Sequence, residues 1–299
     1  MFQPYQPIIT PVKVYRASDV GAPQLKVETG SLKTLLKACL VNGYGEGINR
    51  KEPAGWQITG ETANDAIFYT EYTHDIGLKI ENSGSAFINA YMVGGEHFAQ
   101  YLGYATKSYN NFAYNNLYPM ANWILIACNK GFIFILPYVS SITQYSQILY
   151  FGKINGLYED MGNIGYINTS AGLNGWGAAT IGMQNREPLI VRSQWRDGGT
   201  LPLSSVICNL FSPFNNTSVT FPDDLYKNTI ASALILTEKN GAVRGTLPAL
   251  FWCYHNLQGI VKETDLIEMS DGQQYIKINL SNNGASSHCF VVNLEQWEL

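Results

Sequence analysis

The stretch from Trp123 to Val139 reads WILIACNKGFIFILPYV and is the most apolar part of the chain. Its middle holds Asn129 to Gly131, which would place a charge and a turn at the centre of a bilayer if the stretch crossed a membrane. The runs on either side are rich in β-branched and aromatic residues, which favour strands. The stretch therefore predicts a β-hairpin with strands at 123–128 and 132–138, and not a membrane span.

Strand signals continue on both sides of this hairpin, as β-branched and aromatic runs separated by Gly and Asn. Asn240-Gly241 and Asn283-Gly284 each lie between two such runs, and Asn-Gly tolerates the positive φ angles of tight hairpin turns. The C-terminal part therefore predicts a β-meander. The predicted strands outside the central hairpin are 66–72, 77–81, 86–93, 230–236, 275–280 and 289–294.

One segment near the N-terminus follows a helical pattern instead. We expect Ser31 to cap this helix and Asn42-Gly43 to end it. The apolar residues that recur at helical spacing are Leu32, Leu35, Leu36, Cys39 and Leu40. The predicted fold class is mainly β (α+β), with antiparallel sheets or a sandwich and one clear N-terminal helix at about 31–42.

The length of 299 residues suits one large β domain or two ordinary domains. We place a division near residue 105, between a helix-bearing α+β domain at 1–105 and a β-rich domain at 106–299. Two Gly-rich stretches with few charges, 108–118 and 158–182, are expected to be long ordered loops or contact segments. Heptads and collagen triplets are absent from the sequence, which excludes a coiled-coil or triple-helical shaft.

The composition favours contacts between proteins. Charged residues make up only 14%, whereas aromatic residues reach 13% with 19 Tyr, and interface cores are depleted in charge and enriched in Tyr and Trp. We therefore expect a homo-oligomer, although a Tyr-rich β-protein can also be an ordinary monomer. The net charge of −4 and the scattered Lys and Arg argue against nucleic-acid binding.

The cysteine pattern predicts free, mostly buried thiols. The five cysteines are far apart, without a CxxC pair or a His at ligand spacing, so neither a zinc site nor a compact disulfide framework is indicated. The glycines at 42–47 end a helix and do not open one, so they lack the helix start that binds phosphate, and no cofactor is expected. The start MFQPYQPIITP lacks the basic and apolar regions of a secretory signal, which predicts synthesis in a cytoplasm. The cysteines are Cys39, Cys128, Cys208, Cys253 and Cys289.

Residues that could carry chemistry have plainer interpretations. His288-Cys289 lies at the entry of a predicted strand, and the neighbours His74 and Asp75 would point to opposite faces of a strand. The acid pairs Glu159-Asp160 and Asp223-Asp224 could serve a glycosidase, but sequence neighbours in turns do not set the separation that such an enzyme needs. The prediction is a protein that is not an enzyme, with no catalytic, cofactor-binding or metal-binding residues.

A set of short sequence blocks is spread along nearly the whole chain. The blocks are Val14-Tyr15-Arg16, Asp19 to Pro23, Gly30-Ser31-Leu32, Leu35 to Gly45, Ala54-Gly55-Trp56, Trp123 to Ile126, Phe132 to Phe134, Tyr150 to Ile154, and Arg244 to Leu250 followed by His255. In residues and in order, these blocks resemble a family of virion structural proteins of tailed bacteriophages.

The resemblance implies a virion location, with other virion proteins as partners. We expect a role in the tail, baseplate or neck apparatus; a capsid decoration or collar protein is an alternative. A receptor- or glycan-binding module is another alternative, in which exposed Trp176 and Trp195 would stack on sugar rings. The chain departs from the family where an acid usually replaces Cys128 or Asn129, where another acid stands at Lys153, and where glycine replaces Ala249. These departures argue further against an acid-based active site.

Overall fold

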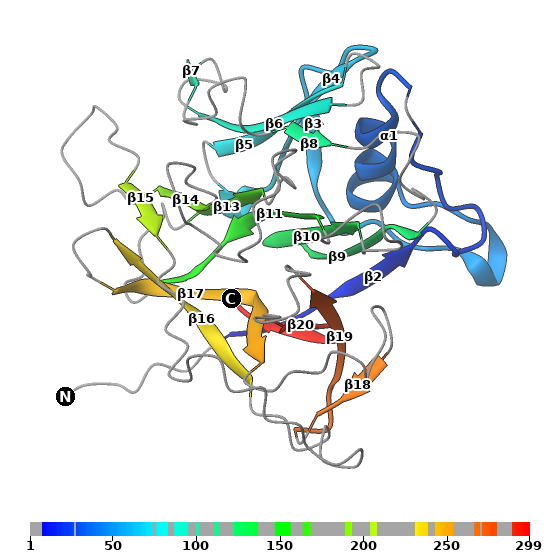
Figure 1. Ribbon diagram of the computed structural model, residues 1–299. Helices are drawn as coiled ribbons and strands as arrows, with labels where there is room; N and C mark the ends of the chain where they lie inside the picture. Colours follow the sequence, from blue (N-terminus) through cyan, green and yellow to red (C-terminus); the bar gives the residue numbers. More distant parts are fainter. Residues whose placement is uncertain are drawn as a thin grey trace.

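A computed structural model describes sixteen segments of the chain, and these contain one α-helix, continued by a π-helix, and many antiparallel strands (Figure 1). The described residues are 8–26, 28–73, 76–82, 87–94, 100–101, 111–113, 122–136, 147–156, 164–168, 189–192, 204–207, 231–238, 243–253, 266–269, 271–279 and 289–299. The helices are α1 (Ser31–Lys37), the π-helix η1 (Ala38–Asn42), and the 3-10 helices η2 (Gly47–Asn49) and η3 (Glu71–Thr73). Among the described residues, no helix is both long enough and apolar enough to cross a membrane. The predicted mainly β fold class with one N-terminal helix is confirmed.

The largest sheet has 13 strands, in the order β18-β19-β20-β17-β16-β15-β14-β13-β11-β10-β9-β2, with β12 pairing beside β17. All its pairs are antiparallel. The strands are β2 (Lys13–Arg16), β9 (Ile124–Cys128), β10 (Gly131–Leu136), β11 (Gln147–Lys153), β12 (Asn155–Gly156), β13 (Ile164–Asn168), β14 (Leu189–Arg192), β15 (Ser204–Ile207), β16 (Ala231–Glu238), β17 (Val243–Cys253), β18 (Leu266–Glu268), β19 (Gln274–Asn279) and β20 (Cys289–Asn293).

Two smaller sheets complete the architecture. The six-stranded sheet has the order β3-β4-β5-β6-β7, with β8 beside β6, and the two-stranded sheet joins β1 near the N-terminus to β21 at the C-terminus. The strands are β1 (Ile9–Pro11), β3 (Gln57–Thr59), β4 (Asp65–Tyr69), β5 (Ile76–Glu81), β6 (Phe87–Gly94), β7 (Gln100–Tyr101), β8 (Asn111–Ala113) and β21 (Gln296–Glu298).

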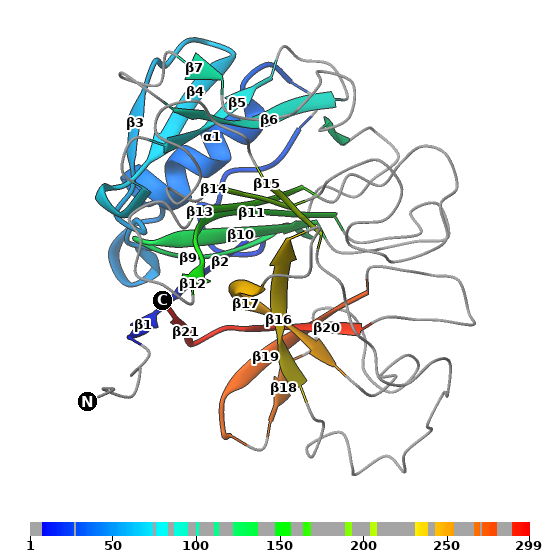
Figure 2. The same cartoon turned by 90° about the vertical axis from the view of Figure 1, so that its left-hand side faces the viewer.

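The predicted central hairpin is confirmed as β9 and β10, and it is buried on both faces. Because successive strand residues point to opposite faces, the two faces belong to different cores. One face carries Phe132 and Phe134 and packs towards α1 and the six-stranded sheet. The other carries Ile133 and Ile135 and packs against β17, β19 and β20. Figure 2 shows the resulting layers, with the six-stranded sheet and α1 above β9 to β11 and the C-terminal strands below.

The N-cap of the helix lies one residue earlier than predicted. Gly30 is the N-cap, with φ 73°, and no side chain caps the helix, so the expected cap at Ser31 is wrong. The Ser31 hydroxyl instead accepts the backbone N–H of Lys26 at 2.8 Å, which holds the preceding loop. Only glycine fits the N-cap position, because a Cβ at Gly30 would lie 2.4 Å from the carbonyl oxygen of Ala63. The predicted end is correct: η1 continues the helix to Asn42, and Gly43 follows with φ 73°.

The C-terminal strands form hairpins, but their order is not that of a simple meander. β16 pairs with β17, and β18, β19 and β20 pair in sequence, yet β20 returns to lie beside β17. This is a Greek-key order, in which a long connection joins β17 to β18. β17 continues through Pro248 and accommodates it where the register with β16 shifts.

Three further predictions concern a strand boundary, two loops and the domain division. The predicted strand at 66–72 ends at Tyr69 and is followed by η3. The stretches 108–118 and 158–182 were expected to be loops, but their described residues form β8 and β13. The division near residue 105 stays a prediction, since that residue is outside the described ranges; β2 joins the large sheet, and one core cluster contains residues from Tyr15 to Ile164.

Candidate functional site

Two loops, residues 17–24 and 43–52, meet at one corner of the molecule and are called the loop pair below. At their contact, a Cβ added to Gly21 would lie 3.0 Å from the Cα of Gly45. A Cβ added to Gly45 would lie 2.4 Å from the carbonyl oxygen of Asn49. Both glycines have positive φ angles, 78° and 74°, which other residues adopt rarely. Glycine is therefore required on both loops for the backbones to approach this closely.

The Asp19 carboxylate ties the two loops together. Its Oδ2 accepts a hydrogen bond from the Tyr44 hydroxyl at 2.6 Å and from the backbone N–H of Arg16 at 2.8 Å. The Lys51 ammonium lies 3.6 Å from the same oxygen. Burial, followed by the hydrogen bond to Asp19, raises the pKa of the Tyr44 phenol. Tyr44 therefore stays a neutral donor, and the arrangement suits a rigid scaffold better than acid–base chemistry.

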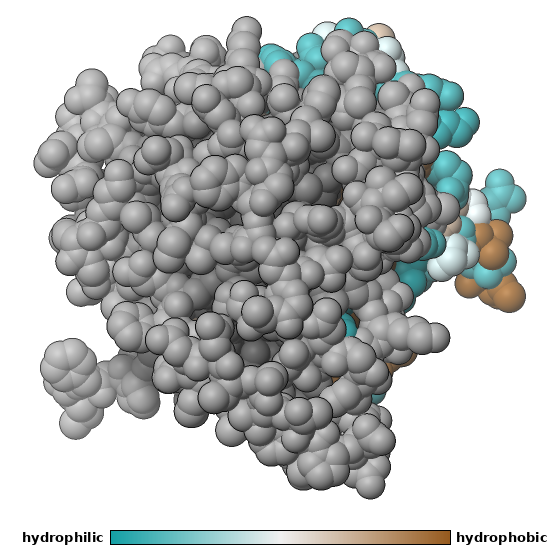
Figure 3. Space-filling view, in the orientation of Figure 1, coloured by the Kyte–Doolittle hydropathy of each residue, from teal (hydrophilic) through white to brown (hydrophobic). Residues whose placement is uncertain are grey.

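The loop pair presents apolar side chains to solvent. Ile48 in η2 is fully exposed, at 101% of its reference area, and Val20 on the facing loop is 64% exposed. In Figure 3, apolar atoms project at the right-hand edge of the described surface, where Figure 1 draws the blue segments of these loops. We interpret these two exposed apolar side chains on a rigid backbone, with charged neighbours such as Arg50, as a candidate protein contact.

Two tryptophans fix the loop pair to the body of the protein. The buried Trp56 donates its Nε1–H to the carbonyl oxygen of Cys128 at 2.8 Å, and its ring centroid lies 5.2 Å from that of Phe132. Trp123 donates to the carbonyl oxygen of Pro23 at 3.1 Å. The backbone N–H groups of residues 54–56 also donate to carbonyls of the π-helix η1. The orientation of the loops is therefore set by the central hairpin.

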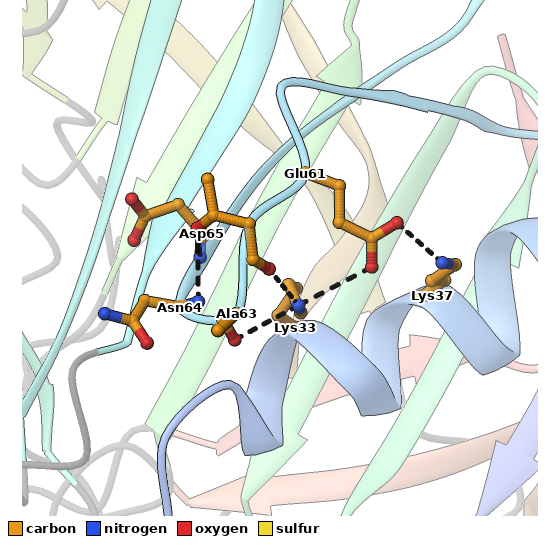
Figure 4. Close-up of polar contacts among 7 residues, drawn as sticks. Lys33, Lys37, Glu61, Ala63, Asn64 and Asp65 are labelled. Atoms are coloured by element: carbon orange, nitrogen blue, oxygen red, sulfur yellow. Dashed lines mark hydrogen bonds and ion pairs between the residues drawn. The ribbon is translucent and has the colours of Figure 1, made fainter.

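A lysine–glutamate cluster anchors α1 to the six-stranded sheet (Figure 4). Lys33 is buried and donates to the carbonyl oxygens of Thr62 and Ala63, the latter at 3.1 Å. Glu61 lies 3.5 Å from Lys33 Nζ and 2.6 Å from Lys37 Nζ. The hydrogen bond from Lys37 is the main cause of a lowered pKa of Glu61. Each donor of the cluster has a partner within the fold, which indicates a structural role.

Lys130 in the hairpin turn is a second buried lysine. Its Nζ donates to the Thr10 hydroxyl and to the Leu299 carbonyl oxygen, both at 3.0 Å, and lies 5.5 Å from the Tyr72 ring centroid. Burial lowers the pKa of Lys130, and the charge of Lys153 lowers it further. Because its partners lie in β1 and after β21, Lys130 joins both terminal strands to the central hairpin.

The two described free thiols lie in the interior of the fold. Cys39 and Cys128 are free and buried, and burial raises the pKa of both thiols. The thiolate is the reactive form of cysteine, so a raised pKa makes these two poor nucleophiles. Across the described ranges, no three His, Cys, Asp or Glu side chains converge as metal ligands would.

The residues weighed from sequence for catalysis or sugar binding fall almost entirely outside the described residues. Cys289 is the exception, since it starts β20 as the sequence predicted. The predictions for the others therefore stay predictions. They are His74, Asp75, Glu159, Asp160, Asp223, Asp224, His288, Trp176 and Trp195.

The loop pair and the two lysine anchors were not predicted as sites. The glycines at 42–47 carried a signal, since a dense Gly run around Tyr44 indicates close backbone approach. No sequence rule predicts that Ile48 is exposed or that Lys130 is buried, because both depend on contacts between distant segments.

Comparison with known proteins adds no relative of this chain. No family model matches it, and no match is found among curated proteins or solved structures.

Proposed function

We propose that this protein is a structural subunit of a tailed-bacteriophage virion that acts through protein–protein contacts in the tail, baseplate or neck apparatus. The observation that carries the proposal is the loop pair, in which Ile48 and Val20 are exposed on a backbone fixed by Gly21, Gly45 and Asp19. A preorganised loop loses little conformational entropy on binding, and a central apolar anchor supplies much of the affinity of an interface.

The sequence blocks that resemble phage virion proteins support the same proposal. Several of them meet around the loop pair: Asp19 bonds to Tyr44, Trp56 packs on Phe132, and Trp123 donates to Pro23. These blocks therefore contribute to the rigid loop pair, which is consistent with a subunit that functions in assembly. The low charge and high Tyr content of the chain fit the same role.

The proposal is tested on phage particles. Mass spectrometry of purified virions should detect the protein, and immunogold labelling should place it on the tail apparatus and not on the capsid or collar. Absence of the wild-type protein from particles would overturn the virion role, and capsid or collar labelling would favour the decoration role instead.

A pair of variants tests the contact surface itself. Ile48→Asp, supplied by complementation, should reduce incorporation into particles by about tenfold or more, because a charge replaces an apolar anchor. Ile8→Asp is the matched control, since Ile8 is also exposed, at 59%, but lies outside the loop pair, and its incorporation should be unchanged. Equal incorporation of the two variants would remove the loop pair from the proposal.

A further inference from the structure

The two edge strands of the 13-stranded sheet differ in whether their outward backbone groups have hydrogen-bond partners among the described residues. At one end, the outward edge of β2 is closed: the Val14 carbonyl oxygen accepts Lys51 Nζ at 3.3 Å, and the Arg16 N–H donates to Asp19. The Val12 N–H, just before β2, donates to the Glu295 carbonyl oxygen at 2.9 Å. Edge strands otherwise offer a template for pairing with another chain, so this end is protected.

The other end of the sheet is β18, and no described residue closes its outward edge in this way. Met269 N–H donates to the Gln273 carbonyl oxygen, which identifies Met269 and Gln273 as a hydrogen-bonded pair. Hydrogen-bonded pairs alternate along an antiparallel ladder, so Ile267 also faces β19 whereas Leu266 and Glu268 direct their backbone groups outward. Across the described segments, no strand or side chain pairs with these outward groups.

This edge is complementary to itself. We propose that β18 pairs antiparallel with β18 of a second copy of this chain, around a two-fold axis at Ile267. In that register Leu266 of one copy lies opposite Glu268 of the other, and each such pair exchanges N–H···O=C hydrogen bonds. A two-fold interface repeats every contact, so the backbone groups on both edges are satisfied together.

The side chains fit the same pairing. Leu266 is 60% exposed and Glu268 is exposed, whereas Ile267 is fully buried on the opposite face. Across the two-fold axis, Leu266 lies beside the aliphatic stem of Glu268, and the two Glu268 carboxylates are not directly opposite each other. Like charges directly opposite would be destabilising in a strand pair, and this register avoids them.

The paired edge is short, so the affinity of the two copies for each other is expected to be low. A ladder of three residues buries far less than the roughly 1,000 Å² of a stable interface, so we expect a weak dimer in solution that is reinforced where copies are held together in an assembly. The inference uses only β18 and does not depend on the loop pair or on a virion location.

Sedimentation of the purified full-length chain tests the inference. A reversible monomer–dimer equilibrium of the wild type should become detectable as its concentration is raised to about 1 mM. Leu266→Pro removes an outward N–H without removing a bond to β19, and should weaken association by about tenfold or more because the two-fold interface loses that bond twice. Leu266→Ala is the matched control that keeps the N–H and should weaken association less.

A cross-linking variant gives an answer even if the proline destabilises β18. Residues opposite each other in a hydrogen-bonded antiparallel pair have Cα atoms about 5.5 Å apart, within the range of Cα separations that a disulfide bridges. Leu266→Cys with Glu268→Cys should therefore form a disulfide-linked dimer under mild oxidation by a low-molecular-weight disulfide, and either single variant should form far less. A wild type that stays monomeric together with a double variant that does not cross-link would overturn the inference, as would unchanged association of Leu266→Pro.

Discussion

Replacing Gly45 by alanine should destabilise the loop pair more than the same change at Gly47, two residues away. Both glycines have positive φ angles, 74° and 54°, so both variants incur the cost of a left-handed alanine, about 1–2 kcal/mol. At Gly47 nothing lies within 4 Å of the added Cβ. At Gly45 the Cβ would lie 2.4 Å from the Asn49 carbonyl oxygen and 3.0 Å from that of Val20, so the backbone must shift.

The backbone shift at Gly45 determines how much unfolding free energy Gly45→Ala is expected to lose. It would disrupt the paired backbone hydrogen bonds between Tyr44 and Lys51, at 3.0 and 2.8 Å, and the Asn49 N–H bond to Glu46 at 3.0 Å. With about 1 kcal/mol for each of the three lost hydrogen bonds added to the cost of the left-handed alanine, Gly45→Ala should cost about 4–5 kcal/mol, against about 1–2 kcal/mol for Gly47→Ala.

Urea unfolding followed by tryptophan fluorescence measures both free energies of unfolding, and amide exchange at Tyr44 and Lys51 reports on the loop pair directly. Exchange at these amides should rise strongly in Gly45→Ala and little in Gly47→Ala. Equal destabilisation of the two variants would refute the close approach of the loops.

Three other changes test the anchors of the fold. Glu61→Gln should remove a pH-dependent stabilisation: the folded pKa of Glu61 is lowered below its ordinary 4.5, chiefly by Lys37, so the ion pair stabilises above that pH and its effect is lost as pH falls. Stability curves of wild type and variant should therefore converge in acid, and a constant difference would contradict this. Trp56→Phe should cost about 1–3 kcal/mol by leaving the Cys128 carbonyl oxygen without its donor, and an unchanged urea midpoint would contradict the buried hydrogen bond. Lys130→Met should speed amide exchange in β1 and β21 but not in β10, because only the terminal strands lose a bond; unchanged exchange would count against this anchor.

The central hairpin and the helix were predictable because their signals are local. Asn129 to Gly131 mark a turn between two apolar runs, and apolar spacing after Ser31 marks a helix. The N-cap was mistaken because Ser31 is a frequent cap, whereas the actual choice of Gly30 depends on the carbonyl of Ala63, which is brought there by another segment. The Greek-key return of β20 to β17 is likewise a long-range choice that turn residues do not encode.

The mainly β class, the helix with its end at Gly43, and the main hairpins follow from residue preferences within a few positions, so they are predictable from the amino-acid order. Which surfaces are covered and which are exposed depends instead on how distant segments pack. Ile48 and Leu266 are apolar residues like those of the core, yet they are exposed because no distant segment packs over them within the described structure. Lys130 is charged, yet it is buried because the terminal strands bring oxygen acceptors to it. Burial depends on contacts between segments far apart in sequence, and that is the physical reason why the candidate contact surfaces could not be identified before the fold was known.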